Sequence, residues 1–311
     1  MKNMSLDDLR NKLSAIDRKL VELIAERQRI VGEIGRTKQT AGRATRDYAR
    51  EKEVLDLGRA QAIELGVDPD VVEVVLRNLI RVSLASQERD RVVAEGKGDG
   101  RTVLIIGGGG KMGGWFAEFF ASQGYATTIA DRSIEDGPNR HRNWTDAGVD
   151  YDVIVVAAPL AVSGRILAQL AVLKPKGLIF DIGSLKSPLL DGLQELQEAG
   201  CRVTSIHPMF GPDTRLLSGR HLIFCDVGVP EATAAAKELF EATMVEQLDM
   251  SLEDHDRLIA YVLGLSHALN IAFFTALAEC GEAAPELARM SSTTIDAQLL
   301  VSEAVAQDNP R

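Results

Sequence analysis

Polar side chains stand at positions in the first ninety residues where apolar ones would continue a helical pattern. Arg27 lies between Leu23 and Ile30 in an apolar seam, and an arginine on a buried face needs an anion. Polar residues that share helical faces further along are Asp47, Arg50, Glu51, Ser83 and Gln87. Each of these alone is equally well explained as a surface ion pair or a helix-pairing residue. Their joint occurrence on three helices predicts a site for a small anion.

A second chemical pattern is a glycine-rich turn directly after a strand-like run. The run 101–107 leads into a GxGxxG turn and then a helix, which predicts a backbone that approaches a dinucleotide pyrophosphate. The expected cofactor-binding residues in this turn are Gly108, Gly110, Met112 and Gly113. Asp131 ends the next strand, where a carboxylate binds ribose hydroxyls and favours NAD over NADP. The adjacent Arg132 leaves NADP open.

A histidine and a serine follow later strands of the same region. Ser184 lies in the segment 181–186, and His207 begins a segment that runs to Asp213. Open α/β sheets bind their ligands at the carboxyl ends of strands, so His207 is a candidate general base. The sequence contains no spacing of cysteines and histidines typical of a metal site, and we predict none.

Three long helices must position the first group of residues. The apolar spacing predicts helices over about 6–39, 47–65 and 69–89, with Ser5 as the cap of the first. At ~1.5 Å per residue the first helix is too long for one small domain to cover. We therefore expect a second copy of the chain to cover it, in a homodimer.

The second group requires a parallel sheet. Strand-like runs alternate with helix-length segments, and they are expected at 103–106, 126–130, 153–157, 178–181 and 203–206. The glycine-rich stretch 95–100 resembles a flexible linker, and helices are expected to return after about Pro230. We predict a multidomain α and α/β chain with a three-helix domain at 1–92, a linker at 93–100, a Rossmann-type doubly wound domain at 101–229 and a helical domain at 230–311. The last domain contains an apolar helix over about 255–277, a candidate subunit or domain core.

Composition excludes several other classes of protein. The chain has 311 residues, 45% of them hydrophobic, and a net charge of −10, which argues against disorder and against a nucleic-acid partner. No leader is apparent, and we expect no apolar run of the roughly 18 residues that a membrane helix needs, so a cytoplasmic protein without a membrane partner is predicted. Cys201, Cys225 and Cys280 are expected to be buried thiols.

The first ninety residues resemble the all-α chorismate mutases. The resemblance rests on Leu9-Arg10-Asn-Lys-Leu13, Ala25-Glu-Arg27, Gly35-Arg-Thr-Lys38, Arg46 to Glu51 and Ser83-Leu-Ala-Ser-Gln87. It implies an intertwined dimer that rearranges chorismate to prephenate. By this resemblance Arg10 of the partner subunit, Arg27 and Arg50 hold the two carboxylates, Lys38 and Gln87 bind the ether oxygen, Glu51 binds the ring hydroxyl, and Asp47 and Ser83 complete the pocket. A rearrangement of this kind needs positioning and a hydrogen-bond donor rather than a nucleophile.

Residues 101 to about 292 resemble the prephenate dehydrogenases, and the order of the two parts is similar to the bacterial fusion of the two enzymes. The resemblance implies that His207 accepts the proton of the ring hydroxyl, that Ser184 orients it, that His267 contacts the substrate and that Asp213 lies near the pocket mouth. The implied route oxidises prephenate with NAD to 4-hydroxyphenylpyruvate, in tyrosine biosynthesis.

The sequence departs from this family after Ser292. The family continues with a proline, an aromatic residue and a substrate-binding arginine, whereas this chain reads Thr293-Thr-Ile-Asp296 and ends before the family's last helices. Either the chain is truncated or the dehydrogenase differs. Candidate replacement cations are Arg215, Arg220, Arg257 and Arg289. Two alternatives stay open: a dehydrogenase half that uses arogenate or an amino analogue, and one that is a non-catalytic regulatory module.

Overall fold

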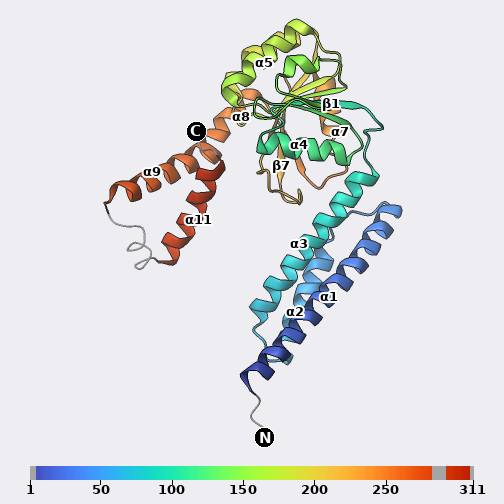
Figure 1. The fold of residues 1–311 in the computed structure, drawn as a ribbon, viewed down its shortest axis with the longest axis vertical. Helices are drawn as coiled ribbons and strands as arrows, with labels where there is room; N and C mark the ends of the chain where they lie inside the picture. The colour runs from blue at the N-terminus through green and yellow to red at the C-terminus, as the bar shows by residue number, and fades with distance from the viewer. Residues whose placement is uncertain (1–4, 282–291, 309–311) are drawn as a thin grey trace.

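The computed structural model describes residues 5–281 and 292–308, which form three helices, an α/β domain and a group of C-terminal helices in that order. Figure 1 shows the first three helices extending from one side of the α/β domain and the C-terminal helices leaving it at another. The expected order of an α, an α/β and a second α region is confirmed.

The helical domain consists of α1 (Leu6–Thr40), α2 (Tyr48–Glu64) and α3 (Pro69–Ala94). Ser5 and Asp8 form a capping box at the start of α1, and Asp47 caps α2 by accepting a hydrogen bond from the backbone N–H of Arg50. Of the described residues in α1, none is buried, and Leu13 remains 60% exposed. The apolar seam of α1 is therefore left uncovered by its own chain.

The α/β domain contains one sheet with the strand order β3-β2-β1-β4-β5-β6-β7-β8. The strands are β1 (Thr102–Ile106), β2 (Ala126–Ala130), β3 (Arg140–His141), β4 (Val153–Val156), β5 (Leu178–Asp181), β6 (Arg202–Pro208), β7 (His221–Cys225) and β8 (Glu246–Met250). The first six run parallel, β7 is antiparallel to β6, and β8 is parallel to β7. The five strands expected from the sequence are present, whereas β3, β7 and β8 were not expected.

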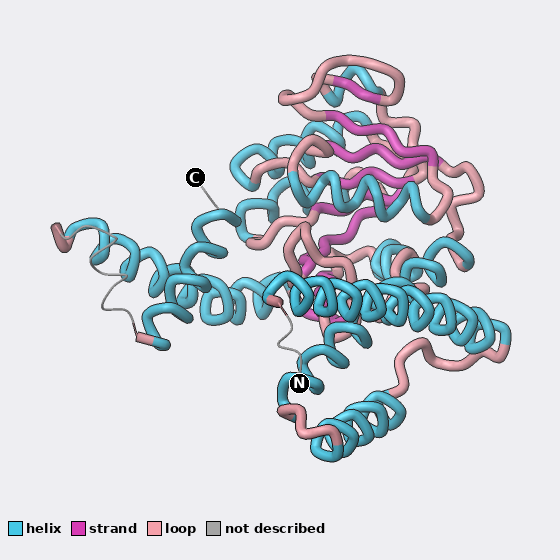
Figure 2. Tube along the Cα trace, turned by 60° about the horizontal axis from the view of Figure 1, so that its bottom comes forward, coloured by secondary structure: helices cyan, strands magenta, loops and turns pink. Residues whose placement is uncertain are grey.

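Helices cover both faces of this sheet, as Figures 1 and 2 show. One face packs on α4 (Lys111–Ser122) and α7 (Pro230–Glu238), and its core is rich in aromatic rings: Phe116, Phe120, Phe180, Phe224 and Phe240. The other face packs on α5 (Leu160–Leu173) and α6 (Leu190–Glu198) through aliphatic side chains. Full burial of one such side chain contributes about 1.5–3 kcal/mol. The short 3₁₀ turns Trp144–Ala147 and Ser187–Leu189 complete the domain.

The sheet continues past the expected domain end at 229. Because β8 pairs with β7, the α/β domain extends to Met250, and the segment after Pro230 is not purely helical. The sequence of β8 is polar and alternating, which suits an edge strand and gives no buried-strand signal.

The expected flexible linker is instead packed against the α/β domain. The backbone N–H of Gly98 donates to the carbonyl of Gln123 at 2.9 Å, and that of Gly100 donates to Gly124 at 3.2 Å. A Cβ on Gly98 would overlap the backbone of Gly124, so glycine here serves close approach rather than flexibility. Val92, near the end of α3, belongs to the aromatic core of the α/β domain.

The C-terminal helices are α8 (Leu252–Ile259), a π-helical segment (Ala260–Leu265), α9 (Ser266–Glu279) and α11 (Thr293–Asp308). Among the described residues, Leu252–Glu279 is one helical stretch long and apolar enough by length and composition to cross a membrane. The expectation that no such run exists is therefore wrong, because no Asp, Glu, Lys or Arg occurs from Leu258 to Ala278. Core helices of water-soluble proteins meet the same criterion.

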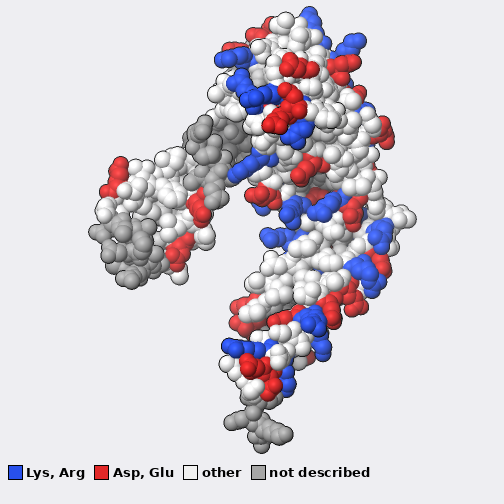
Figure 3. All heavy atoms as spheres, in the orientation of Figure 1, with Lys and Arg blue, Asp and Glu red and all other residues white. Residues whose placement is uncertain are grey.

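These helices expose much of their apolar surface. On the face drawn in Figure 3 they are mostly uncharged, with a few acidic side chains. Asn270 of α9 is buried, and its side-chain oxygen accepts hydrogen bonds from Ser302 at 2.6 Å and Gln298 at 2.8 Å, both in α11. Within one chain, α9 and α11 are therefore joined by a polar contact. The expected apolar helix does not form the core of a domain within its own chain.

The three cysteines differ in exposure. Cys201 and Cys225 are buried as expected, and burial raises the pKa of the Cys225 thiol to about 11. Cys280 is exposed, contrary to expectation, because it caps the end of α9.

Candidate active sites

A cavity of about 450 Å³ lies among the three N-terminal helices. Its lining includes every residue expected for the anion site except one: Arg27, Lys38, Asp47, Arg50, Glu51, Ser83 and Gln87. Arg10 is the exception, since it lies near the start of α1, exposed, with its guanidinium 3.5 Å from Asp7. A contribution of Arg10 to the site of another subunit stays a prediction.

Arg27 is half-buried in this cavity and has no acidic partner among the described residues. Its guanidinium donates hydrogen bonds to the hydroxyl of Ser83 at 2.6 Å and to the carbonyl of Leu79 at 3.2 Å. Burial lowers the pKa of Arg27, a sign that the charge is partly removed from water without a compensating anion. The cavity thus offers a cation that an anionic ligand can neutralise.

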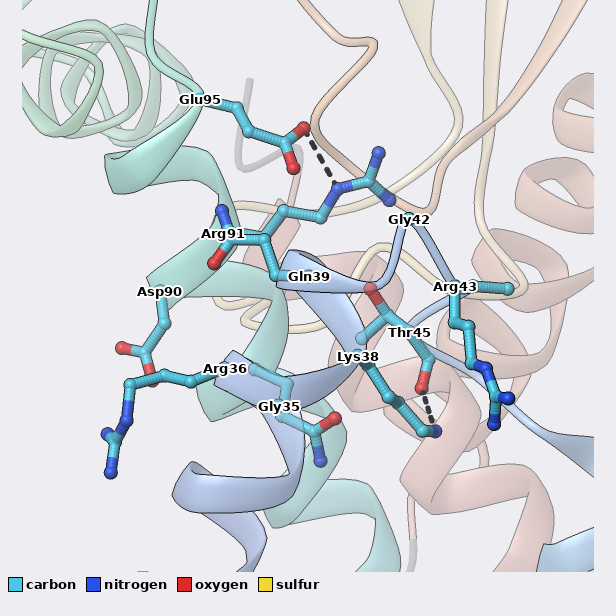
Figure 4. A pocket seen from close by; sticks show the side chains of 12 residues that line it. Gly35, Arg36, Lys38, Gln39, Gly42, Arg43, Thr45, Asp90, Arg91 and Glu95 are labelled. Atoms are coloured by element: carbon cyan, nitrogen blue, oxygen red, sulfur yellow. Dashed lines mark hydrogen bonds and ion pairs between the residues drawn. The ribbon is translucent and has the colours of Figure 1, made fainter.

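Lys38 and Gln87 lie where this cavity meets a smaller one of about 210 Å³. The ammonium of Lys38 donates to the carbonyl of Thr45 at 2.8 Å, and Figure 4 shows this bond between the end of α1 and the loop that follows it. The side-chain oxygen of Gln87 is buried without a hydrogen-bond partner among the described residues. A ligand in the cavity would supply polar partners to both side chains.

Glu51 is held by a residue that sequence reasoning did not assign. Arg46 makes a two-point contact with the Glu51 carboxylate, at 2.9 and 3.0 Å, and lies 4.3 Å from the ring centre of Tyr48. The hydrogen bond with Glu51 raises the pKa of Arg46. Arg46 also donates to the hydroxyl of Ser218 at 2.8 Å, so the helical cavity is tied to the β6–β7 loop of the α/β domain.

Glu88 makes a second tie between the two domains. It is 4% exposed, and its carboxylate accepts hydrogen bonds from the backbone N–H groups of Leu217 at 2.7 Å and Met244 at 2.5 Å. Burial raises the pKa of Glu88, although the two backbone donors act in the opposite direction. No sequence signal identified this contact, because its partners are more than a hundred residues away.

The glycine-rich turn after β1 fits a dinucleotide. Gly107 has φ +93°, and a Cβ on Gly113 would overlap the carbonyl oxygen of Gly107, so side chains here would fill the turn. Gly110 caps α4 without a side-chain hydrogen bond, and the start of an α-helix is a favourable place for an anion. The backbone N–H groups of Gly108 and Gly110 donate to the carbonyls of Ala130 at 3.3 Å and Gly107 at 3.0 Å. Cofactor binding by Gly108, Gly110, Met112 and Gly113 stays a prediction. Asp131 follows β2 beside this turn and accepts hydrogen bonds from the backbone of Gly109 at 3.2 Å and Ser133 at 2.8 Å.

His207 lies near the carboxyl end of β6 and is 4% exposed. Its Nδ1 is 2.8 Å from Nε2 of His255, whose Nδ1 is 2.8 Å from Asp256. Burial, followed by the charges of Lys186 and His255, lowers the pKa of His207 to about 3. His207 is therefore neutral near neutral pH, as a general base must be. The roles of His255 and Asp256 were missed because these residues lie at the start of the expected apolar helix and belong to no motif.

A buried ion pair lies behind His207. Lys186 and Asp181 are both fully buried and 2.9 Å apart, and Lys186 also donates to the carbonyl of Ile206 at 2.8 Å. One oxygen of Asp181 and the hydroxyl of Ser205 have no partner among the described residues. In the segment 181–186 the sequence indicated Ser184 as the functional residue. In the structure Ser184 is exposed, and Lys186 is the buried residue.

Among the described residues, none of the other expected dehydrogenase residues is hydrogen-bonded to His207. Ser184 is exposed after β5, Asp213 is exposed in the β6–β7 loop, and His267 is half-buried on α9. Of the candidate clamp residues, Arg215 and Arg220 are exposed, Arg257 pairs with Asp254 at 2.8 Å, and Arg289 lies outside the described residues.

Two family matches cover the two sites. Residues 9–88 match chorismate mutase type II, and residues 127–246 match the nucleotide-binding domain of prephenate dehydrogenase. The chain is 31% identical to the T-protein of Enterobacter agglomerans over 97% of this chain and 79% of that protein. It is 28% identical to the T-protein of Haemophilus influenzae over 86% of this chain and 69% of that protein.

Among solved structures, the fold is similar to that of the prephenate dehydrogenase of Aquifex aeolicus. The TM-score is 0.51 at 18% identity, and the match covers 67% of this chain and 84% of the other. The helical cavity, the glycine-rich turn beside Asp131 and the buried His207 thus occur in a chain whose two halves match the two enzyme families in the expected order. The chain belongs to the T-protein family of bifunctional chorismate mutases/prephenate dehydrogenases.

Proposed function

We propose that this T-protein works as a homodimer, with a chorismate mutase site completed by the partner's first helix and an NAD-dependent prephenate dehydrogenase site around His207. The chain rearranges chorismate to prephenate and oxidatively decarboxylates prephenate to 4-hydroxyphenylpyruvate in tyrosine biosynthesis. Both reactions involve small dianions in water, which is consistent with a cytoplasmic location.

The observation that carries the mutase assignment is the half-buried Arg27 in the helical cavity, which has no acidic partner among the described residues. Arg27 and Arg50 bind the carboxylates of chorismate and hold it folded so that the reacting carbons meet. Lys38 and Gln87 donate to the ether oxygen, where negative charge grows as the C–O bond breaks. Glu51, oriented by Arg46, accepts the hydrogen bond of the ring hydroxyl.

The homodimer is proposed from the uncovered seam of α1. Leu9, Leu13, Ile16 and Leu20 are each more than half exposed along this helix. An apolar stripe of this length in water is typical of an interface. The same pairing brings Arg10 of one chain toward the cavity of the other.

In the dehydrogenase half, the turn 107–113 and the N-terminus of α4 hold the pyrophosphate of NAD, and Asp131 binds the adenosine ribose. Bound NAD supplies an acceptor for the hydride of the ring carbon. Neutral His207 takes the proton of the ring hydroxyl at Nε2. Ser184, His267 and Asp213 remain proposed substrate contacts, and the cation that binds the side-chain carboxylate is one of the exposed arginines of the β6–β7 loop, Arg215 or Arg220.

The test is NADH formation by the purified chain with prephenate and NAD, with chorismate consumption measured in the same preparation. Both activities are expected. Chorismate consumption without NADH from prephenate, but with NADH from arogenate, would assign the second half to the amino analogue. Failure of both dehydrogenase substrates with an active mutase would contradict the bifunctional assignment and favour the regulatory alternative.

A further inference from the structure

His207 is the first of three side chains joined end to end. Its Nδ1 lies 2.8 Å from Nε2 of His255, and the two rings are inclined at 63°. His255 is fully buried on α8, and its own Nδ1 lies 2.8 Å from Oδ1 of Asp256. Hydrogen bonding at these distances requires one proton between each pair of atoms.

Asp256 is held as an anion at the end of this chain. Its carboxylate accepts hydrogen bonds from the backbone N–H groups of Lys186 at 2.8 Å and Ser187 at 2.7 Å, and from the Ser187 hydroxyl. Burial opposes ionisation, but the hydrogen bonds from Ser187, Lys186 and His255 outweigh it and lower the pKa of Asp256 to about 2. Asp256 is therefore an acceptor at neutral pH.

The charge on Asp256 determines where the protons of both imidazoles lie. An ionised carboxylate only accepts, so Nδ1 of His255 carries a proton and donates it to Asp256. A neutral His255 then has a bare Nε2, which must accept from Nδ1 of His207. His207 is left with a bare Nε2, the nitrogen that a general base requires.

We propose that Asp256 and His255 are positioning residues for the dehydrogenase, which fix His207 in the tautomer whose free Nε2 accepts the substrate proton. The inference rests on the proposed dehydrogenase activity. In the step itself, the O–H bond of the ring hydroxyl breaks and a new N–H bond forms at Nε2 of His207. The O–H electron pair forms the second C–O bond of the carbonyl as the hydride leaves that ring carbon, which the cofactor NAD would accept. The resulting imidazolium is stabilised through His255 by the Asp256 carboxylate.

The surroundings of His207 give this arrangement a definite pH behaviour. The charged and titratable groups that face it are Asp181 at the end of β5, Lys186 in the loop after β5, and His255 and Asp256 on α8. Lys186 and His255 act with burial to keep His207 neutral, whereas Asp256 favours its protonated form. Removing the Asp256 charge therefore lowers the pKa of His207 further and allows its other tautomer.

The decisive variant is Asp256→Asn, which keeps the size of the side chain and removes its charge. We expect kcat for NADH formation to fall roughly 100- to 10,000-fold, with smaller changes in KM for prephenate and NAD. The acid limb of the pH profile of kcat/KM should move to lower pH. The matched control is Asp254→Asn on the same helix, where the carboxylate is exposed and pairs with Arg257.

The competing explanation is that Asp256 only holds α8 against the loop that contains Lys186 and Ser187, with no effect on the tautomer of His207. It predicts a lower activity with an unchanged pH profile, and that result would overturn the proposal. Chorismate consumption by Asp256→Asn serves as the control for folding. An Asp256→Asn activity within about threefold of the unsubstituted chain would overturn the proposal as well.

A second measurement separates this inference from the function on which it rests. The chain has five histidines, so heteronuclear NMR of the imidazole nitrogens can identify His207 by comparison with His207→Gln. We expect the Nδ1–H tautomer of His207 in the unsubstituted chain and the Nε2–H tautomer in Asp256→Asn. If the chain oxidises neither prephenate nor arogenate, the proposed function fails, while the tautomer measurement still supports or overturns the positioning chain.

Discussion

The carboxylate of Glu88 on α3 accepts a hydrogen bond from the backbone N–H of Leu217, 2.7 Å away in the loop between β6 and β7. Glu88 directly follows Gln87, which lines the helical cavity, and Leu217 lies four residues after Asp213. One short side chain thus connects the wall of the mutase site to the loop of the dehydrogenase site.

Replacing Glu88 by alanine is expected to destabilise the junction of the two domains. The N–H groups of Leu217 and Met244 would lose their acceptor in a buried place, at a cost of about 2–4 kcal/mol in the free energy of unfolding. Urea denaturation measures this loss. Glu95→Ala, which removes only a surface ion pair with Arg91, should change stability by less than about 1 kcal/mol. Equal stability of the two variants would contradict a role for Glu88 at the junction.

Asp256 is expected to stabilise the fold in a pH-dependent way. The pKa of Asp256 falls from 3.8 to about 2 on folding. Its contribution to the free energy of unfolding is therefore complete at pH values above 3.8 and disappears as the pH falls toward 2. The unsubstituted chain should exceed Asp256→Asn in unfolding free energy by about 2 kcal/mol near neutral pH. Denaturation across the acid range should show this difference shrinking. A difference that stays constant down to the lowest pH would exclude the ionised Asp256 as its source.

Lys38→Ala is expected to reduce the mutase rate alone. Loss of the donor to the ether oxygen typically costs roughly 100- to 1,000-fold in kcat. Chorismate consumption followed by absorbance measures the effect, and NADH formation from prephenate should remain. Lys52→Ala, an exposed lysine on α2, is the matched control and should leave both rates unchanged. A mutase rate that survives Lys38→Ala would remove this lysine from the proposed mechanism.

Two adjacent glycines provide a paired test of the cofactor turn. A Cβ on Gly113 would overlap the carbonyl oxygen of Gly107, whereas a Cβ on Gly114 would lie 4.0 Å from its nearest neighbour, the oxygen of Gly108. Gly113→Ala should therefore raise KM for NAD strongly or abolish NADH formation, and Gly114→Ala should preserve it. NAD titrations with mutase activity as the folding control distinguish the two. Similar KM values would show that the turn does not hold the cofactor.

Mixed dimers test the proposed contribution of Arg10 from the partner subunit. Arg10→Ala and Arg27→Ala chains should each be poor mutases. After the two are unfolded together and refolded, half of the dimers are mixed, and one site in each mixed dimer is intact, so about a quarter of the mutase activity should return. No recovery, with mixed dimers demonstrated by differently tagged chains, would mean that Arg10 and Arg27 of the same chain serve one site, or that Arg10 lies outside the site.

The sequence predicted well those features that depend on local patterns. The three N-terminal helices, the five central strands and the glycine turn follow from periodicity, capping residues and strand–turn–helix order. The positions of Arg27 and Gln87 on helical faces placed them in one cavity because a helix converts spacing into direction.

Features that depend on contacts between distant segments were not predicted. The pairing of His207 with His255 spans 48 residues, and that of Glu88 with Met244 spans 156. His207 follows an expected strand and was predicted, but His255 and Glu88 carry no local signal, since a buried imidazole or carboxylate without a motif is recognisable only from its surroundings. The edge strand β8 was missed for a related reason: its polar, half-exposed side chains lack the apolar run of a central strand.

The packing of Gly98 and the burial of Val92 have a consequence for any separation of the two enzymes. A break in the chain here would not release two finished proteins, because Val92, in the last turn of α3, packs in the hydrophobic core of the α/β domain. A gene split here would leave the helical half with Val92 exposed and with Glu88 without its backbone donors. It would leave the α/β half with part of its hydrophobic core exposed to water. The fusion is therefore difficult to reverse in evolution, since two free enzymes would each need a newly polar surface where the other had been.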